Sequence, residues 1–169
     1  MKKKILSVVA AAALVASLTV PAWAAVGSPY GDAEAEGGDA SYTTQAQTGE
    51  DSQATQVYET IQGAESTEQE LDLLGDGLAE TVQAELGATS VNEYSAREIG
   101  SVAVSSEGST TVTLSNLAGV TEGTEGFVMY LGTDGLWYYL PVTFGSRSAT
   151  FTVPYSTTII LYVRTAAAV

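Results

Sequence analysis

The sequence predicts an α+β fold, with one or two short N-terminal helices packed on a small antiparallel β-sandwich or open barrel of about six strands. Apolar residues recur at helical spacing over residues 51–88. From residue 89 to residue 169 the pattern changes to short β-branched and aromatic segments with a two-residue period, separated by turns. The 169 residues include no Cys, so an ordinary hydrophobic core, and not disulfides, must hold this fold together.

The first 24 residues have the parts of a secretory signal peptide. Lysines at positions 2–4 precede the mainly apolar run 5–20, which Pro21 ends, and Ala22 and Ala24 supply the small residues that a signal peptidase reads. A membrane anchor is the alternative, but the run is shorter than the roughly 20 residues that cross a bilayer, and no basic cluster follows it. We therefore expect cleavage after Ala24 and a secreted, extracellular protein that is at most loosely associated with the cell surface.

Cleavage there leaves three arginines against 20 acidic residues, a formal charge of −17. Nucleic-acid binding is not expected, because it requires Lys and Arg to displace the counterions of the phosphates. Anionic membrane surfaces are disfavoured for the same reason. Because the chain also has no His and no Cys, histidine and thiol catalysis are excluded, and we predict no cofactor, no catalytic residue and no metal site.

Residues 25–50 are expected to form a disordered acidic spacer. They are almost entirely Gly, Ala, Ser, Thr, Gln and acidic residues, which bury too little apolar surface to offset the entropy of ordering. Asp32, Glu34, Glu36 and Asp39 are closely spaced, but they lack the spacing of a calcium-binding loop. A solvated acidic tail is therefore the preferred interpretation.

The helical segment begins with a short amphipathic element between Ala54 and Ile61, and Gly63 follows as a stop. Ser66 and Gln69 have the spacing of a capping box, so a second helix should begin there.

This second helix carries one apolar stripe with a weak point in its middle. The stripe consists of Leu71, Leu74, Leu78, Val82 and Leu86. Gly75 and Gly77 each cost about 1 kcal/mol relative to alanine, so we expect a kink or a break there, with Asp76 as the new N-cap. Gly87 should end the helix.

Turn residues divide the C-terminal segment into short strands. The expected strands are 99–105, 110–117, 127–131, 136–144, 149–153 and 157–164. Asp134-Gly135 between two apolar runs predicts a β-hairpin. Pro141 cannot donate to a strand ladder, so its strand must lie at an edge or contain a bulge.

The last strand also suggests a third hypothesis. Residues 157–163 are apolar, uncharged and free of proline, which favours edge-to-edge pairing if the strand is exposed. A self-assembling surface component is therefore kept as a less favoured alternative.

The pattern Asp134-Gly135-x-Trp137-x-x-Leu140-Pro141, with the strands around it, resembles small immunoglobulin- or fibronectin-like β modules of secreted and cell-surface proteins of Gram-positive gut bacteria. The resemblance covers residues 89–169 and consists of turns and core positions. It implies an extracellular, non-enzymatic module with a structural or binding role. Residues 165–169 contain no sorting motif or basic stop, so covalent attachment to a cell wall is not expected.

Consecutive aromatic residues provide the candidate binding residues. Trp137 and Tyr139 should point to one face of their strand and Tyr138 to the other. Either the helices cover these rings, which are then core, or Tyr138 together with Tyr130 or Tyr155 forms an exposed platform. We take Tyr138, Tyr130, Tyr155 and Trp137 as the candidate binding residues.

Carboxylates are the only acid–base groups near the predicted sheet, namely Glu93, Glu98, Glu107, Glu122, Glu125 and Asp134. A glycosidase needs two such groups roughly 5–10 Å apart across a cleft, whereas turn geometry and solubility already account for these residues. The sequence therefore predicts a secreted, non-enzymatic binding or adhesion-type accessory module that contacts an extracellular protein partner. The alternative is a carbohydrate-binding module that uses exposed aromatic rings, with or without calcium.

Overall fold

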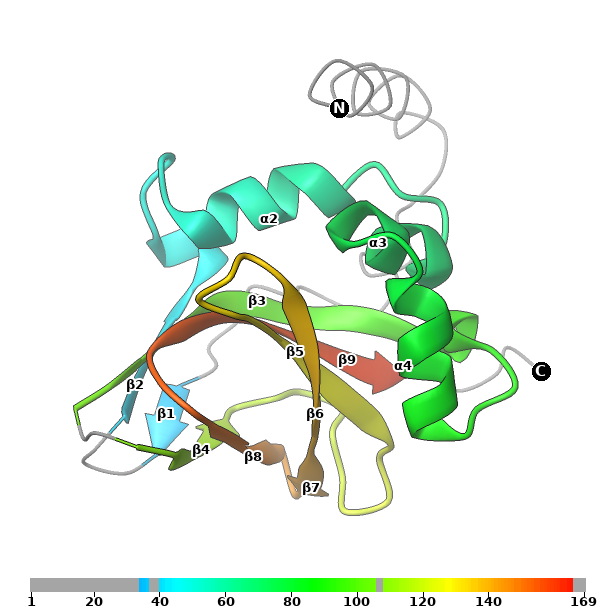
Figure 1. The fold of residues 1–169 in the computed structure, drawn as a ribbon. Coiled ribbons are helices and arrows are strands. Elements are labelled where there is room, and N and C mark those ends of the chain that lie inside the picture. The colour runs from blue at the N-terminus through cyan, green and yellow to red at the C-terminus, as the bar shows by residue number, and fades with distance from the viewer. Residues whose placement is uncertain (1–33, 37–39, 106–107, 166–169) are drawn as a thin grey trace.

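The computed structural model describes residues 34–36, 40–105 and 108–165 (Figure 1). The predicted signal peptide lies outside the described residues. No helix in the described part of the chain is long and apolar enough to span a membrane.

Helices occupy one continuous stretch of the chain. The described residues form three α-helices, α2 (Gln53–Ile61), α3 (Thr67–Leu74) and α4 (Leu78–Leu86), and two 3-10 turns, η2 (Gln45–Gln47) and η3 (Val91–Glu93). The helix 53–61 and the second helical region therefore fall where the sequence predicts them.

Capping explains where α3 begins. The Ser66 hydroxyl accepts a hydrogen bond from the Gln69 amide at 3.2 Å, which is one half of the predicted capping box. The Gln69 side chain does not return to Ser66. It accepts the Glu65 amide at 2.9 Å instead.

The predicted break lies between α3 and α4, but the expected cap is wrong. Gly77, with φ of 75°, is the N-cap of α4, and Asp76 is not. A left-handed backbone is required at this position, and glycine adopts it without the steric cost that a Cβ brings. Gly87, with φ of 61°, ends α4 as predicted.

Nine strands form in the described residues, more than the six or so expected. They are β1 (Glu34–Glu36), β2 (Ala40–Thr44), β3 (Tyr94–Val104), β4 (Thr110–Ser115), β5 (Gly126–Leu131), β6 (Trp137–Pro141), β7 (Thr143–Gly145), β8 (Ser148–Val153) and β9 (Thr157–Arg164). One sheet has the order β2-β3-β9-β5-β6 and the other β1-β4-β8-β7, with every pairing antiparallel. The two sheets are separate, so the sandwich alternative is confirmed and the barrel is not.

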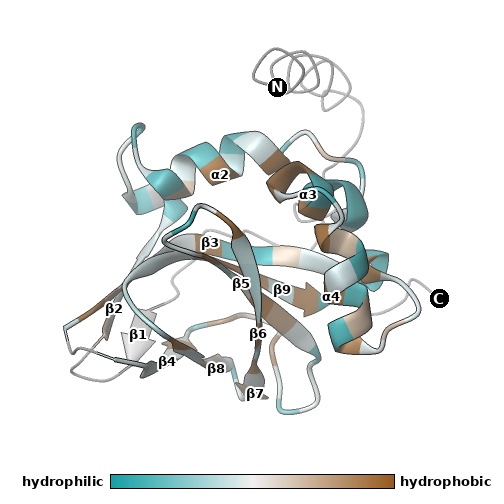
Figure 2. Cartoon of the chain, viewed as in Figure 1, coloured by the Kyte–Doolittle hydropathy of each residue, from teal (hydrophilic) through white to brown (hydrophobic). Residues whose placement is uncertain are grey.

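These elements make three layers. Helices α2, α3 and α4 cover one face of the five-stranded sheet, and the four-stranded sheet lies on the opposite side (Figure 1). One core lies between the helices and the large sheet, where Leu71 and Val82 meet Phe127 and Met129. A second core lies between the sheets, and the hydrophobic stretch of β9 contributes to both (Figure 2).

Part of the predicted spacer is ordered, so the expectation of disorder over residues 25–50 is wrong for residues 34–36 and 40–50. Residues 25–33 and 37–39 lie outside the described residues. Strand β2 pairs with β3 along its whole length, Thr44 is buried, and the Tyr42 hydroxyl donates to Glu98 at 3.3 Å. An existing sheet edge supplies backbone partners, so a segment with few apolar side chains can still become ordered. The helices consequently follow two strands and are not N-terminal to the whole sheet.

The strand expected over 136–144 is two strands in different sheets. β6 pairs with β5 as far as Pro141, and β7 begins at Thr143 in the other sheet. Proline has no N–H to continue the ladder, so the chain leaves the first sheet there. β6 is an edge strand of the large sheet, as Pro141 predicts.

Strand β9 is the central strand of the large sheet. It pairs with β3 on one side and with β5 on the other. Its backbone is therefore not an open edge in the folded molecule, and the self-assembly hypothesis has no structural support in this strand.

Replacing Gly100 by alanine should detach β2. A Cβ at Gly100 would lie 2.5 Å from the Thr43 carbonyl oxygen and 2.5 Å from the Tyr42 ring, so one of them must move. We expect a loss of about 1–3 kcal/mol in the free energy of unfolding. Urea denaturation measures it, with Gly123→Ala as the control because that Cβ would meet nothing within 4 Å. Equal stability of the two variants would contradict the placement of β2.

Candidate recognition surface

Strand β6 directs its aromatic side chains to opposite faces of the large sheet. Trp137 and Tyr139 pack against the helix-covered core and are half-buried. Tyr138 points the other way and lies opposite Tyr130 of β5, with ring centroids 5.5 Å apart and planes 29° apart. The helices therefore cover the Trp137 face and leave the Tyr138 face to the second sheet.

Tyr155 completes a cluster of three rings. It comes from the connection between β8 and β9 and meets Tyr130 edge-to-face at 6.2 Å. We call Tyr130, Tyr138 and Tyr155 the tyrosine cluster. The β5–β6 hairpin and the β8–β9 connection thus build one surface.

The second sheet covers only part of this cluster, because Tyr130 packs against the core between the sheets and Tyr138 does not. Along β6, Leu140 packs partly against the core between the sheets, whereas Tyr138 remains 39% exposed. Leu136, next to the hairpin turn, is 60% exposed. These two are the exposed large hydrophobic residues of the described chain. Tyr138 and Leu136 therefore form an exposed apolar surface next to the hairpin turn, beyond the part of β6 that packs on the core between the sheets.

The hairpin turn holds two of the three rings, those of Tyr138 and Tyr155, through their hydroxyls. The Tyr138 hydroxyl donates to Asp134 Oδ2 at 2.5 Å, and Asp134 Oδ1 accepts the Leu136 amide at 3.0 Å. The Tyr155 hydroxyl accepts the Thr133 amide at 3.1 Å. A Cβ at Gly132 would lie 2.5 Å from Asp134 Oδ1 and 2.6 Å from the Tyr138 ring, so glycine is required at that position. The cluster is held in place before any partner arrives.

Electrostatics at the turn keep Asp134 ionised. The hydrogen bond from Tyr138, followed by that from the Leu136 amide, lowers the pKa of the Asp134 carboxyl below its usual value. The same bond raises the pKa of the Tyr138 hydroxyl, which therefore stays protonated at neutral pH. The surface combines neutral phenol rings with one fixed negative charge.

Three of the four candidate binding residues are brought together, and one is not. Trp137 lies on the other face, packed against the helix-covered core. Sequence reasoning assigned no binding role to Leu136, and treated Asp134 only as a turn residue and acid–base candidate. The Asp-Gly turn could have indicated a role for Asp134 beside the rings, because it places Asp134 four residues before Tyr138 on the same hairpin.

The other acid–base candidates are dispersed over the molecule. Glu93 and Glu125 both pair with Arg164, the former at 2.5 Å. Glu98 is buried beside Tyr42, Glu122 is exposed in a turn, and Glu107 lies outside the described residues. Within the described ranges, no three acidic residues are grouped so that they could hold a metal ion.

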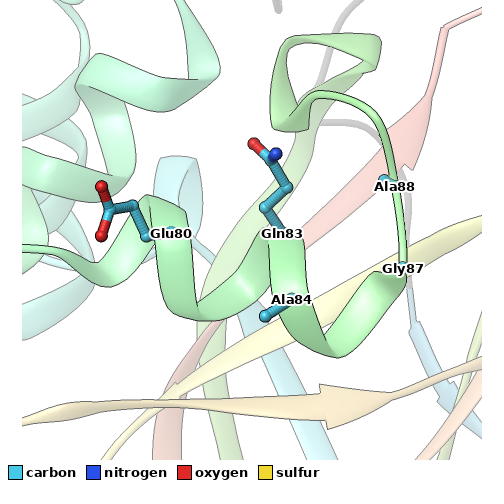
Figure 3. A pocket seen from close by; sticks show the side chains of 5 residues that line it. All are labelled: Glu80, Gln83, Ala84, Gly87 and Ala88. Carbon is cyan, nitrogen blue, oxygen red and sulfur yellow. The ribbon is translucent and has the colours of Figure 1, made fainter.

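A shallow hollow of about 400 Å³ beside α4 is a weaker candidate for a functional site than the tyrosine cluster. It is lined by Glu80, Gln83, Ala84, Gly87 and Ala88 (Figure 3). Figure 3 shows the side chains of Glu80 and Gln83 projecting from the helix without meeting. One carboxylate and one amide do not make an acid–base pair, so the tyrosine cluster is the stronger candidate.

Comparisons with protein-family models, with curated proteins and with solved structures found no match. The architecture therefore defines the protein only as a two-sheet antiparallel sandwich with a helical layer.

Tyr138→Ala should leave the fold nearly as stable as the wild type. The side chain is partly exposed and loses one ring contact and one surface hydrogen bond, so we expect a cost of about 1 kcal/mol or less. Urea denaturation measures this difference. A loss above about 3 kcal/mol would show that Tyr138 belongs to the core.

Proposed function

We propose that this protein is a secreted, non-enzymatic binding module that contacts an extracellular protein partner through the tyrosine cluster and Leu136. The observation that carries the proposal is the exposure of Tyr138 and Leu136 side by side on a fixed hairpin. Exposed apolar surface costs solubility and is typical of interaction sites.

The cluster has the properties of an interface anchor. Tyrosine supplies a large contact area with little conformational freedom to lose, and such residues dominate binding energy at interfaces. Here the freedom is already reduced, since Tyr138 is hydrogen-bonded to Asp134 and stacked on Tyr130. Less entropy is then lost when a partner binds.

A protein partner fits this surface better than a glycan, because the more exposed of the two apolar side chains is aliphatic. Leu136 suits an apolar side chain of a partner, whereas a sugar ring stacks on an aromatic face. Carbohydrate binding is the second candidate, and the open ring of Tyr138 beside the carboxylate of Asp134 favours it. A glycan array probed with and without a chelator separates the two candidates and tests the calcium-assisted form.

The non-enzymatic part of the proposal rests on how the carboxylates are used. Glu93 and Glu125 are engaged with Arg164, and Asp134 is engaged with Tyr138. Neither His nor Cys is present, so acid–base chemistry would fall to carboxylates, and these three are already engaged in ion pairs or hydrogen bonds.

Export can be tested directly. If the first 24 residues are a signal peptide, protein recovered from the culture medium should begin at Ala25. Intact-mass measurement detects this, and recovery of the uncleaved chain only from inside cells would contradict the proposal.

The binding proposal is tested by comparative capture. Immobilised wild type and Tyr138→Ala are exposed to the same extracellular proteins, and any captured protein is then purified and titrated against both. We expect saturable binding that Tyr138→Ala weakens at least tenfold. Gln83→Ala, in the hollow beside α4, is the control and should bind like the wild type. Equal binding by Tyr138→Ala, or a loss confined to Gln83→Ala, would overturn the proposal.

A further inference from the structure

We propose that the segment of the partner that docks on the tyrosine cluster is cationic, with an arginine or lysine head group on the ring of Tyr138 beside Asp134 and its aliphatic stem on Leu136. This inference rests on the proposed function and names the chemistry of the partner. It is carried by charge, by ring geometry and by unused hydrogen-bonding capacity.

The charge of the protein is strongly complementary to such a segment. The chain has 20 acidic residues against 6 basic ones. Of the three arginines in the described part of the chain, Arg97 is buried, Arg164 is held between two carboxylates, and Arg147 is exposed. A cationic partner is therefore attracted over a long range, and an anionic one is repelled.

The ring of Tyr138 is suited to a cation. Tyr130 stacks on it at 5.5 Å, and the exposed part of Tyr138 remains open to a ligand. Its hydroxyl donates to a carboxylate, which increases the electron density of the ring and strengthens the attraction of a cation to its face.

Asp134 has acceptor capacity left for that cation. A carboxylate offers about four acceptor positions, and hydrogen bonds from the Tyr138 hydroxyl, the Leu136 amide and its own backbone amide occupy at most three of them. The side chain is exposed. An arginine placed over Tyr138 can thus donate to Asp134 while its stem covers Leu136.

Binding of a synthetic arginine peptide tests the inference. One peptide alternates arginine with Gly-Ser spacers, and its partner has citrulline at every arginine position, which keeps the shape and removes the charge. Titration by fluorescence anisotropy should show binding of the arginine peptide that weakens with salt, and at least tenfold weaker binding of the citrulline peptide.

Variants separate the site from the general negative charge. Asp134→Asn should weaken arginine-peptide binding about fivefold or more, and Glu122→Gln, with the same change of charge at the opposite end of β5, less than twofold. Tyr138→Leu keeps the apolar bulk and should weaken binding about tenfold, and melting curves confirm that each variant is folded. Three results would each overturn the inference. They are equal effects of Asp134→Asn and Glu122→Gln, wild-type binding by Tyr138→Leu, and equal binding of the arginine and citrulline peptides. Capture of a partner that depends on Tyr138 would still leave the proposed function standing in those cases.

Discussion

Replacing Phe127 by alanine is expected to cost about 3–5 kcal/mol in the free energy of unfolding, enough to unfold a marginally stable domain. Phe127 is 0% exposed. Its ring stacks on Tyr162 at 4.7 Å and meets Tyr94 edge-to-face at 5.5 Å. Removal of the ring leaves a cavity between the helices and the large sheet that these neighbours cannot fill without leaving their own positions.

Urea denaturation of Phe127→Ala and Tyr138→Ala makes the comparison, because both variants remove an aromatic ring from neighbouring strands. The first ring is enclosed and the second is partly exposed. A large loss for Phe127→Ala with a small loss for Tyr138→Ala is expected. A loss below about 1 kcal/mol for Phe127→Ala would contradict the arrangement of the core.

Replacing Glu70 by glutamine should remove a large pH dependence of stability. Glu70 lies on α3 and is 1% exposed, and its Oε2 has no hydrogen-bond partner within the described residues. Burial raises the pKa of this carboxyl from 4.5 to about 8, and the neighbouring Tyr162 hydroxyl offsets only part of that rise. At neutral pH the folded protein therefore holds Glu70 as a neutral acid.

The unfolded chain releases this proton above about pH 4.5, whereas the folded chain keeps it up to about pH 8. The stabilising contribution is thus fully present below pH 4.5 and is lost as the pH rises to 8, by about 1.4 kcal/mol per unit. Between pH 5 and pH 8 the wild type should lose on the order of 3 kcal/mol more than Glu70→Gln.

Urea denaturation of the wild type and of Glu70→Gln at pH 5 and pH 8 measures this change in the free energy of unfolding. The contributions of the other acidic residues are the same in both proteins and cancel in the difference. Glu68→Gln, two residues earlier on α3 and exposed, is the matched control and should follow the wild type. Parallel curves for the wild type and Glu70→Gln would contradict the burial of an uncompensated carboxyl under α3.

The elements that sequence reasoning predicts well are those whose signals are local. The strand predicted over 157–164 coincides with β9, because a β-branched apolar run follows a Pro-Tyr-Ser turn. The break between α3 and α4 follows from two glycines in three positions. In each case the neighbouring residues alone decide the backbone.

Strands that depend on distant partners were missed. β2 contains only one large apolar side chain, that of Tyr42, and it is ordered because β3, some 60 positions later, offers it an edge. β7 has three residues and becomes a strand only by pairing with β8. Composition does not carry such information, since the stabilising partner is remote in sequence.

The tyrosine cluster was predictable in part. The two-residue period places Tyr138 opposite in orientation to Trp137, and the hairpin places it beside Tyr130. The position of Tyr155 depends on how the β8–β9 connection passes from the smaller sheet to the large one, and the exposure of Leu136 depends on which neighbours the fold places over the hairpin. Neither can be read from one strand.

Hydroxyl-radical footprinting of the protein, free and bound to its purified partner, tests most directly whether this surface makes the contact. The oxidation rates of Tyr138 and Leu136 are compared with that of Tyr58, which lies on α2 under the opposite face. We predict that binding protects Tyr138 and Leu136 severalfold and leaves Tyr58 unchanged. Protection elsewhere, with Tyr138 and Leu136 oxidised as fast as in the free protein, would contradict a recognition role for the tyrosine cluster.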